Sequence, residues 1–210
     1  MIEMGMENSI DDILKDVSGP SIELDIPVSS SKDIFAVHQR QAWDKTVEAR
    51  CDFTYNLRIT KRSDVHFISV WKKSLYGRTL TDIKSDPAMV DVFASAMTSV
   101  ISGTLGDFLS TASWCIVTSP KRRHKVKNFA TMISEKIAGN LDIPFYEDAA
   151  LCHSRHRMNA VFTANNIPSE SNVIVFDDFV TTGQTLASMK RLLTNHGKNL
   201  IFFAGINNKL

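Results

Sequence analysis

The stretch "VIVFDDFVTTGQTL", residues 173–186, contains the features that decide the fold. Four apolar residues come first, and such runs are typical of strands that are buried on both faces. Two adjacent acids, Asp177 and Asp178, follow directly, and then come hydroxyl side chains and Gly183. Apolar residues at helical spacing continue from Leu186. The stretch therefore predicts a strand, an anion-binding turn and a helix in succession.

The second half of the chain repeats this alternation. Short apolar runs predict strands at 114–118, 143–146, 158–162, 173–176 and 200–205. Segments 127–141 and 183–197 have helical periodicity, and Gly197 is expected to end the second helix. Strands that alternate with helices pair in parallel through right-handed crossovers. We therefore predict an open, mainly parallel α/β sheet flanked by helices, with ligands bound beyond the carboxyl ends of its strands.

The first half is organised differently. Residues 1–32 predict a flexible or partly helical arm, and residues 33–83 predict an N-terminal hairpin region. In that region alternate residues from Phe53 to Ile59 are apolar, the segment 61–64 reads as a turn, and a second strand starts at Val65. Residues 84–210 form the expected core, which begins with a helix capped at Ser85 or Asp86 and ending at Gly103.

Composition excludes several classes of protein. The net charge of +1 does not favour a nucleic-acid partner, and no run of about 18 apolar residues suggests a membrane partner. The acidic N-terminus does not resemble a secretory signal. Three widely spaced cysteines disfavour a disulfide framework and fit a reducing cytoplasm. Cys152, His153 and His156 could contribute to a metal site, although a solvated loop is the favoured interpretation.

The turn after Asp178 has the chemistry of a phosphate site. Unpaired N–H groups and partial positive charge at a helix N-terminus attract phosphate, and Gly183 allows close approach of the backbone. Two carboxylates beside a phosphate are favourable only if they bind neutral hydroxyls or a divalent cation. A sugar phosphate satisfies both requirements.

These residues closely resemble the phosphoribosyl pyrophosphate (PRPP) signature of type I phosphoribosyltransferases: four apolar residues, two acids, two variable positions and T-T/S-G-x-T. The resemblance implies that Asp177 and Asp178 hold the ribose hydroxyls and Mg²⁺, the latter directly or indirectly. It also implies a 5′-phosphate loop made of Val180, Thr181, Thr182, Gly183, Gln184 and Thr185.

Residues 115–145 and "RHRMNAVF", residues 155–162, resemble segments of the ComF-like branch of that family. Asn128 and Ala130 depart from its pattern, and the zinc-binding N-terminus of that branch is missing. The resemblance implies a hood that includes the hairpin, and a mobile loop in which Arg155 and Arg157 reach the pyrophosphate. It implies a pyrophosphate loop formed by Ser119, Pro120, Lys121, Arg122 and Arg123.

The implied activity is transfer of ribose 5-phosphate from Mg-PRPP to a nucleobase-like nitrogen. Two alternatives stay open. The first is a PRPP- or nucleotide-sensing subunit without turnover, which docks to a protein partner through its N-terminal region or forms a homodimer. The second is a nucleic-acid-associated protein that uses the basic segment 121–127.

Overall fold

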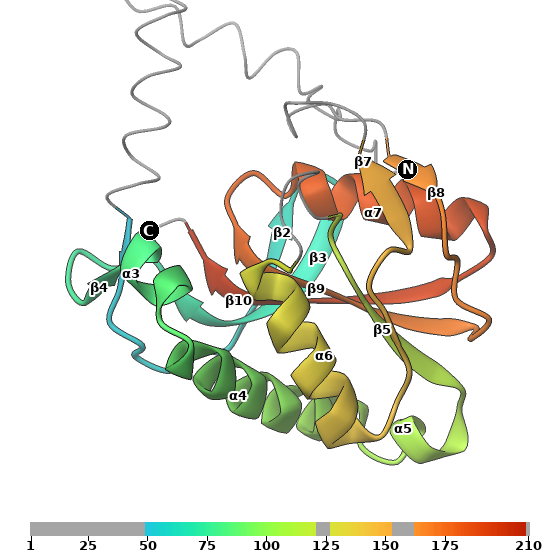
Figure 1. Ribbon diagram of the computed structural model, residues 1–210, viewed down its shortest axis with the longest axis horizontal. Helices are drawn as coiled ribbons and strands as arrows, with labels where there is room; N and C mark the ends of the chain where they lie inside the picture. The colour runs from blue at the N-terminus through green and yellow to red at the C-terminus, as the bar shows by residue number, and fades with distance from the viewer. Residues whose placement is uncertain (1–48, 121–126, 153–161, 209–210) are drawn as a thin grey trace, which may run out of the picture. The chain divides into compact units, whose positions relative to one another are not determined.

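A six-stranded sheet forms the centre of the computed structural model, which describes residues 49–120, 127–152 and 162–208 (Figure 1). Five strands run parallel, and β2 pairs antiparallel with β3 at one edge. The strand order is β2 (Arg58–Arg62), β3 (Val65–Lys72), β10 (Asn199–Asn207), β9 (Asn172–Val180), β5 (Trp114–Thr118) and β6 (Phe145–Tyr146). The predicted open, mainly parallel α/β sheet is confirmed.

Helices cover both faces of the sheet. On one face α4 (Ala88–Leu105) and α6 (Phe129–Leu141) lie side by side and bury apolar residues of β5, β9 and β10. On the other face α7 (Gln184–Asn195) packs over Val65, Phe67 and Phe202. Gly197 ends α7 with a φ of 71°, as predicted. Strands buried on both faces explain the continuous apolar runs of the sequence.

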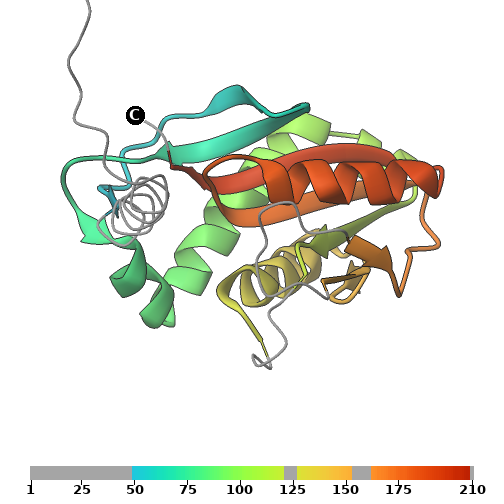
Figure 2. The ribbon, with the colours of Figure 1, turned by 90° about the horizontal axis from the view of Figure 1, so that it is seen from above.

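The predicted hairpin is present and belongs to the main sheet. β2 and β3 are joined at Ser63 and Asp64, and β3 continues the sheet by pairing with β10, beside which the hairpin lies in Figure 2. The alternation that starts at Phe53 does not make a strand before Arg58, and Phe53 itself adopts a φ of 58°, outside the extended region. Ile59, on this edge strand, is 76% exposed.

The first core helix is longer than predicted. Asp86 Oδ1 accepts a hydrogen bond from Ala88 N at its start, but α4 passes through Gly103 and ends at Gly106, whose φ is 51°. Gly103 has open space around it and nothing forces the chain to turn there. By length and a mean hydropathy of 1.4, α4 could also cross a membrane, which the sequence did not lead us to expect. Its apolar face packs in the core of the domain, as in core helices of globular proteins.

The remaining elements are short. β1 (Arg50–Cys51) pairs with β4 (Arg78–Thr79), and β7 (Ala150–Cys152) pairs with β8 (Phe162–Ala164). α3 (Leu80–Ser85) and α5 (Phe108–Thr111) lie before and after α4. The predicted arm at 1–32 and most of the predicted strand at 158–162 lie outside the described residues.

Candidate functional site

The two adjacent acids lie inside β9. The strand was expected to end at Phe176, but it continues to Val180, because Phe179 and Val180 pair with Ile206 and Asn207 of β10. Asp177 and Asp178 are therefore 6% and 8% exposed. A buried carboxylate is stable only when charges or hydrogen bonds compensate for its lost hydration.

Two groups from other parts of the chain and one neighbouring backbone N–H compensate Asp177 and Asp178. Ser119, directly after β5, donates from Oγ to Asp177 Oδ1 over 3.2 Å. Asp178 Oδ1 accepts from Phe179 N at 2.9 Å, and Lys84 Nζ of α3 lies 2.7 Å from Asp178 Oδ2. The ammonium of Lys84 also lies 4.5 Å from the centre of the Phe179 ring. The acids thus gather a hydroxyl and a cation at the carboxyl edge of the sheet.

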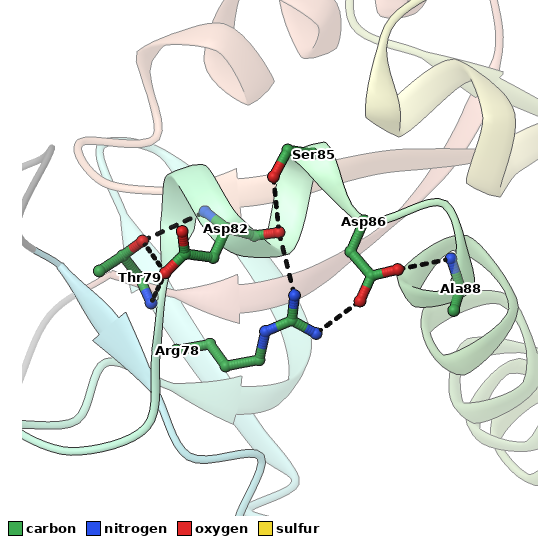
Figure 3. Close-up of polar contacts among 6 residues, drawn as sticks. All are labelled: Arg78, Thr79, Asp82, Ser85, Asp86 and Ala88. Atoms are coloured by element: carbon green, nitrogen blue, oxygen red, sulfur yellow. Dashed lines mark hydrogen bonds and ion pairs between the residues drawn. The ribbon is translucent and has the colours of Figure 1, made fainter.

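Lys84 is held in place by the capping of α3, drawn in Figure 3. Thr79 and Asp82 form a reciprocal capping box, and the hydrogen bond from the Thr79 hydroxyl lowers the pKa of Asp82. Arg78 donates to Asp86 Oδ2 at 2.8 Å and to the carbonyl of Asp82 at 3.2 Å. The hydrogen bond from Arg78 to the Asp86 carboxylate is the main cause of the lowered pKa of Asp86. The network ties both ends of α3 together and fixes the direction from which Lys84 approaches.

An aromatic cluster around Phe93 packs in the core, on the face of the sheet that α4 and α6 cover. Phe93 of α4 lies with its ring centre 5.2 Å from that of Phe129 and 4.7 Å from that of Trp71. Phe93 can approach β10 only because Gly205 has no Cβ: a Cβ there would lie 2.5 Å from the Phe93 ring and 2.8 Å from the carbonyl oxygen of Asp178. Trp71, at the end of the hairpin region, is a buried core residue.

The turn from 181 to 185 leads from β9 into α7. Gly183 has a φ of 80° and precedes the helix as its N-cap, where it has no side chain of its own to cap the helix. The first helical N–H, that of Gln184, donates to Thr182 Oγ1 over 3.4 Å. Asn208 Nδ2 donates to Thr181 Oγ1 at 3.1 Å, and Thr181 and Thr182 are exposed. This is the arrangement in which a helix N-terminus binds an anion.

The β2–β3 hairpin contacts this turn, which the sequence did not predict. Ser63 Oγ donates to the carbonyl of Thr182 over 3.1 Å, and Gln184 Nε2 donates to Ser63 Oγ over 3.2 Å. A Cβ at Gly183 would lie 2.5 Å from Arg62 Cβ. Gly183 thus serves the packing of the hairpin as well as the conformation of the turn.

The predicted pyrophosphate loop is described only at its start. Ser119 and Pro120 are buried beside the acids, whereas Lys121, Arg122, Arg123, Arg155 and Arg157 lie outside the described residues. The described part of the chain begins again at Lys127. Asn128 caps α6, because its Oδ1 accepts a hydrogen bond from Thr131 N over 2.8 Å. The departure from the ComF-like pattern at Asn128 thus has a structural role.

The ion pair of Asp178 bears on how Mg²⁺ could bind at the carboxylates. Direct ligation at Asp178 Oδ2 does not suit the structure, because the Lys84 ammonium 2.7 Å away would repel a divalent cation. The described residues contain no group of three or more His, Cys, Asp or Glu side chains that could hold a metal ion. Neutral hydroxyl groups can donate to the carboxylate oxygens of the acid pair without the repulsion that a divalent cation would meet at Lys84.

Comparison with known proteins gives similar structures at low identity. An adenine phosphoribosyltransferase shares 15% identity at a TM-score of 0.46, with coverage of 72% of this chain and 84% of that chain. The adenine phosphoribosyltransferase of Saccharomyces cerevisiae has 14% identity and a TM-score of 0.44, with coverage of 80% of this chain and 89% of that chain. The orotate phosphoribosyltransferase of Aeropyrum pernix has 14% identity and a TM-score of 0.39, with coverage of 76% of this chain and 75% of that chain.

No family model matches the chain, and no curated protein matches it by sequence. The three TM-scores lie below 0.5. The geometry defines an α/β protein with an open sheet, two buried acids in β9 and a helix with a glycine N-cap directly after that strand.

Proposed function

We propose that this protein is a phosphoribosyltransferase that binds Mg-PRPP and transfers its ribose 5-phosphate to a nucleobase-like nitrogen, releasing pyrophosphate. One observation carries the proposal: the signature-like residues 173–186 place two buried acids and then a helix N-terminus with a glycine N-cap in direct succession after one strand. A sugar phosphate has hydroxyls for the first and a phosphate for the second.

In the proposed complex the chain's own residues position the sugar. Asp177 and Asp178 accept hydrogen bonds from the ribose hydroxyls, and Ser119 keeps Asp177 oriented. The N–H groups from 181 to 185 hold the 5′-phosphate. The basic residues Lys121, Arg122 and Arg123, with Arg155 and Arg157, are proposed to stabilise the departing pyrophosphate. Mg²⁺, when bound, neutralises pyrophosphate charge.

The branch of the family, the cellular location, the hood and the protein partners are proposed from the sequence alone. Membership of the ComF-like branch rests on residues 115–145 and 155–162, and a cytoplasmic location rests on cysteine usage. A hood that includes the hairpin, and a homodimer or protein partner at the N-terminal region, are proposals of the same kind.

A second candidate is a PRPP- or nucleotide-binding regulator without turnover. The ion pair between Lys84 and Asp178 favours it, because a ligand hydroxyl must share or displace this cation. Displacement would link ligand binding to movement of α3, which is a useful property in a sensor.

Incubation of the protein with PRPP, Mg²⁺ and a panel of purine and pyrimidine bases distinguishes the candidates. The transferase releases pyrophosphate with at least one base, and the Asp177→Asn/Asp178→Asn variant does not. Tight PRPP binding without pyrophosphate release would favour the regulator, and absence of both would reject the two proposals together.

A further inference from the structure

A polar cavity lies on the edge of the sheet formed by β2, β3 and the end of β10. Its volume is about 260 Å³. Seven residues line it: Asn56, Arg58, Thr60, Arg62, Ser69, Lys72 and Asn207. Three of these side chains carry positive charge, and none of the seven carries negative charge. The composition differs from that of a typical ligand pocket, which is mostly apolar.

Arg62 is oriented by neutral partners. Its Nη2 donates to Asn207 Oδ1 over 3.0 Å, and Asn207 Nδ2 donates in turn to Thr60 Oγ1 over 3.3 Å. Its Nε is buried and has no hydrogen-bond partner among the described residues. The guanidinium is therefore fixed in direction while its charge is not neutralised.

Arg58 and Lys72 add to this excess of charge. No carboxylate in the described part of the chain forms an ion pair with Arg58, Arg62 or Lys72. The pairing of Arg58 with Ser69 and of Lys72 with Asn207 brings the charges to one cavity from two strands. Like charges gathered in a concave site repel one another unless an anion occupies it.

We propose that this cavity is a binding site for the phosphate group of a small metabolite. Three cations suit a dianionic phosphate better than a single carboxylate, and guanidinium groups match phosphate oxygens in pairs. The cavity is large enough for a phosphate with a small substituent and too small for most of a nucleotide, since sites for drug-sized ligands start at about 300 Å³.

The cavity is distinct from the phosphate turn of the proposed transferase site. The turn offers backbone N–H groups at 181–185, whereas the cavity offers side chains of β2 and β3. The two adjoin where Arg62 packs against Gly183. The inference does not depend on the proposed function, because it uses no residue of the acid pair or of the phosphate turn.

The test is a titration of ¹⁵N-labelled protein with inorganic phosphate, followed by NMR. The side-chain amide signals of Asn56 and Asn207 and the Nε–H signal of Arg62 are expected to shift together and to saturate. In Arg58→Gln/Lys72→Gln the affinity read from these signals should fall at least about tenfold, because two charge-assisted contacts are lost.

Lys61→Gln/Lys136→Gln is the matched control. It removes two positive charges, as the test variant does, but both lysines are exposed and lie outside the cavity, so the affinity should stay within about twofold of wild type. An equal loss in Lys61→Gln/Lys136→Gln would overturn the proposal. So would a wild-type titration up to about 10 mM phosphate that shifts only Gly183 and Thr185, and this outcome needs no variant.

Discussion

Asp178 illustrates how a single residue is stabilised by a partner that the local sequence does not reveal. Its carboxylate is nearly buried beside a second acid, and Lys84 approaches it from a helix 94 positions earlier in the numbering. The Lys84 side chain is 45% exposed and that of Asp178 is 11% exposed. Removal of the lysine should leave a poorly hydrated charge, which is more costly than loss of a surface pair.

Lys84→Met is therefore expected to lower the free energy of unfolding by about 1–3 kcal/mol. Lys127→Met is the control, because Lys127 is also 45% exposed but pairs with Glu135, which is 54% exposed. Exposed pairs contribute about 0–1 kcal/mol. Urea unfolding of both variants measures the difference, and equal losses would contradict the account of Asp178.

Gly183 gives a second prediction at this scale. Gly183→Ala must place a Cβ 2.5 Å from Arg62 Cβ at a φ of 80°, whereas Gly197→Ala has a φ of 71° and nothing within 4 Å. The positive φ costs about 1–2 kcal/mol in each variant. Thermal unfolding should show a larger loss for Gly183→Ala, and ribose 5-phosphate binding should weaken in this variant alone. Indistinguishable unfolding curves would show that Arg62 moves away freely.

The roles of single residues were only partly predictable from the sequence. The signature-like spacing led to Asp177, Asp178 and Gly183, because chemistry and chain order coincide there. Lys84 and Arg62 act through contacts across long sequence separations, and neither belongs to a local pattern. Only the topology of the sheet brings them to the site.

At the scale of elements, α3 shows how a six-residue helix can orient a functional side chain. Helices this short are unstable alone, and α3 depends on its capping box and on Arg78. Arg78 bonds to the carbonyl of Asp82 and to Asp86, and thereby links α3 to the start of α4. The orientation of Lys84 follows from these bonds.

Arg78→Met should change the acid dependence of stability. The bond to Arg78 lowers the pKa of Asp86 below its ordinary value of 3.8. A carboxyl with a lowered folded-state pKa stabilises the protein above pH 3.8 and loses this effect as pH falls through the folded-state pKa. The stability difference between wild type and variant should therefore shrink from pH 5 towards pH 2 in urea titrations. A difference independent of pH would assign Arg78 a packing role alone.

Element boundaries were less predictable than element types. The hairpin, the helices α6 and α7 and the strands β5, β6, β9 and β10 were predicted from periodicity and are present. Gly103 was expected to stop α4, yet a solvent-exposed glycine is tolerated within a helix. β9 extends past the acids because β10 supplies partners for Phe179 and Val180, which periodicity within one segment cannot show.

At the scale of the whole domain, two apolar clusters on the faces of the sheet contain the cysteines Cys51 and Cys115, both free thiols. Burial raises the pKa of Cys51 to about 11 and that of Cys115 to about 12. Neither thiol should ionise near neutral pH in the folded protein, whereas both ionise near pH 9 once unfolded.

Two measurements follow. Thiol labelling at pH 8 with mass spectrometry should modify Cys152, which is half-buried, well before Cys51 or Cys115. Stability should fall as pH rises from 9 to 11, because the unfolded state releases the thiol protons first. Labelling of Cys115 as fast as Cys152 in folded protein would show that the core opens locally.

The domain's fold was predictable from alternation of strands and helices, whereas the place of the hairpin within it was not. β3 joins the sheet beside β10, the last strand of the chain, and no sequence periodicity links segments so far apart. The cavity between β2, β3 and β10 is a consequence of that pairing. It could be found only once the sheet order was known.

The most direct test of the account is calorimetric titration with PRPP in the presence of Mg²⁺, comparing wild type with Asp177→Asn/Asp178→Asn. Asp107→Asn/Asp142→Asn, at exposed positions away from the acid pair, controls for the change in charge. The account predicts saturable binding for wild type and the control, and no detectable binding for the variant of the acid pair, with all three proteins folded by circular dichroism. Equal affinity in all three would contradict the claim that the buried acids hold the sugar.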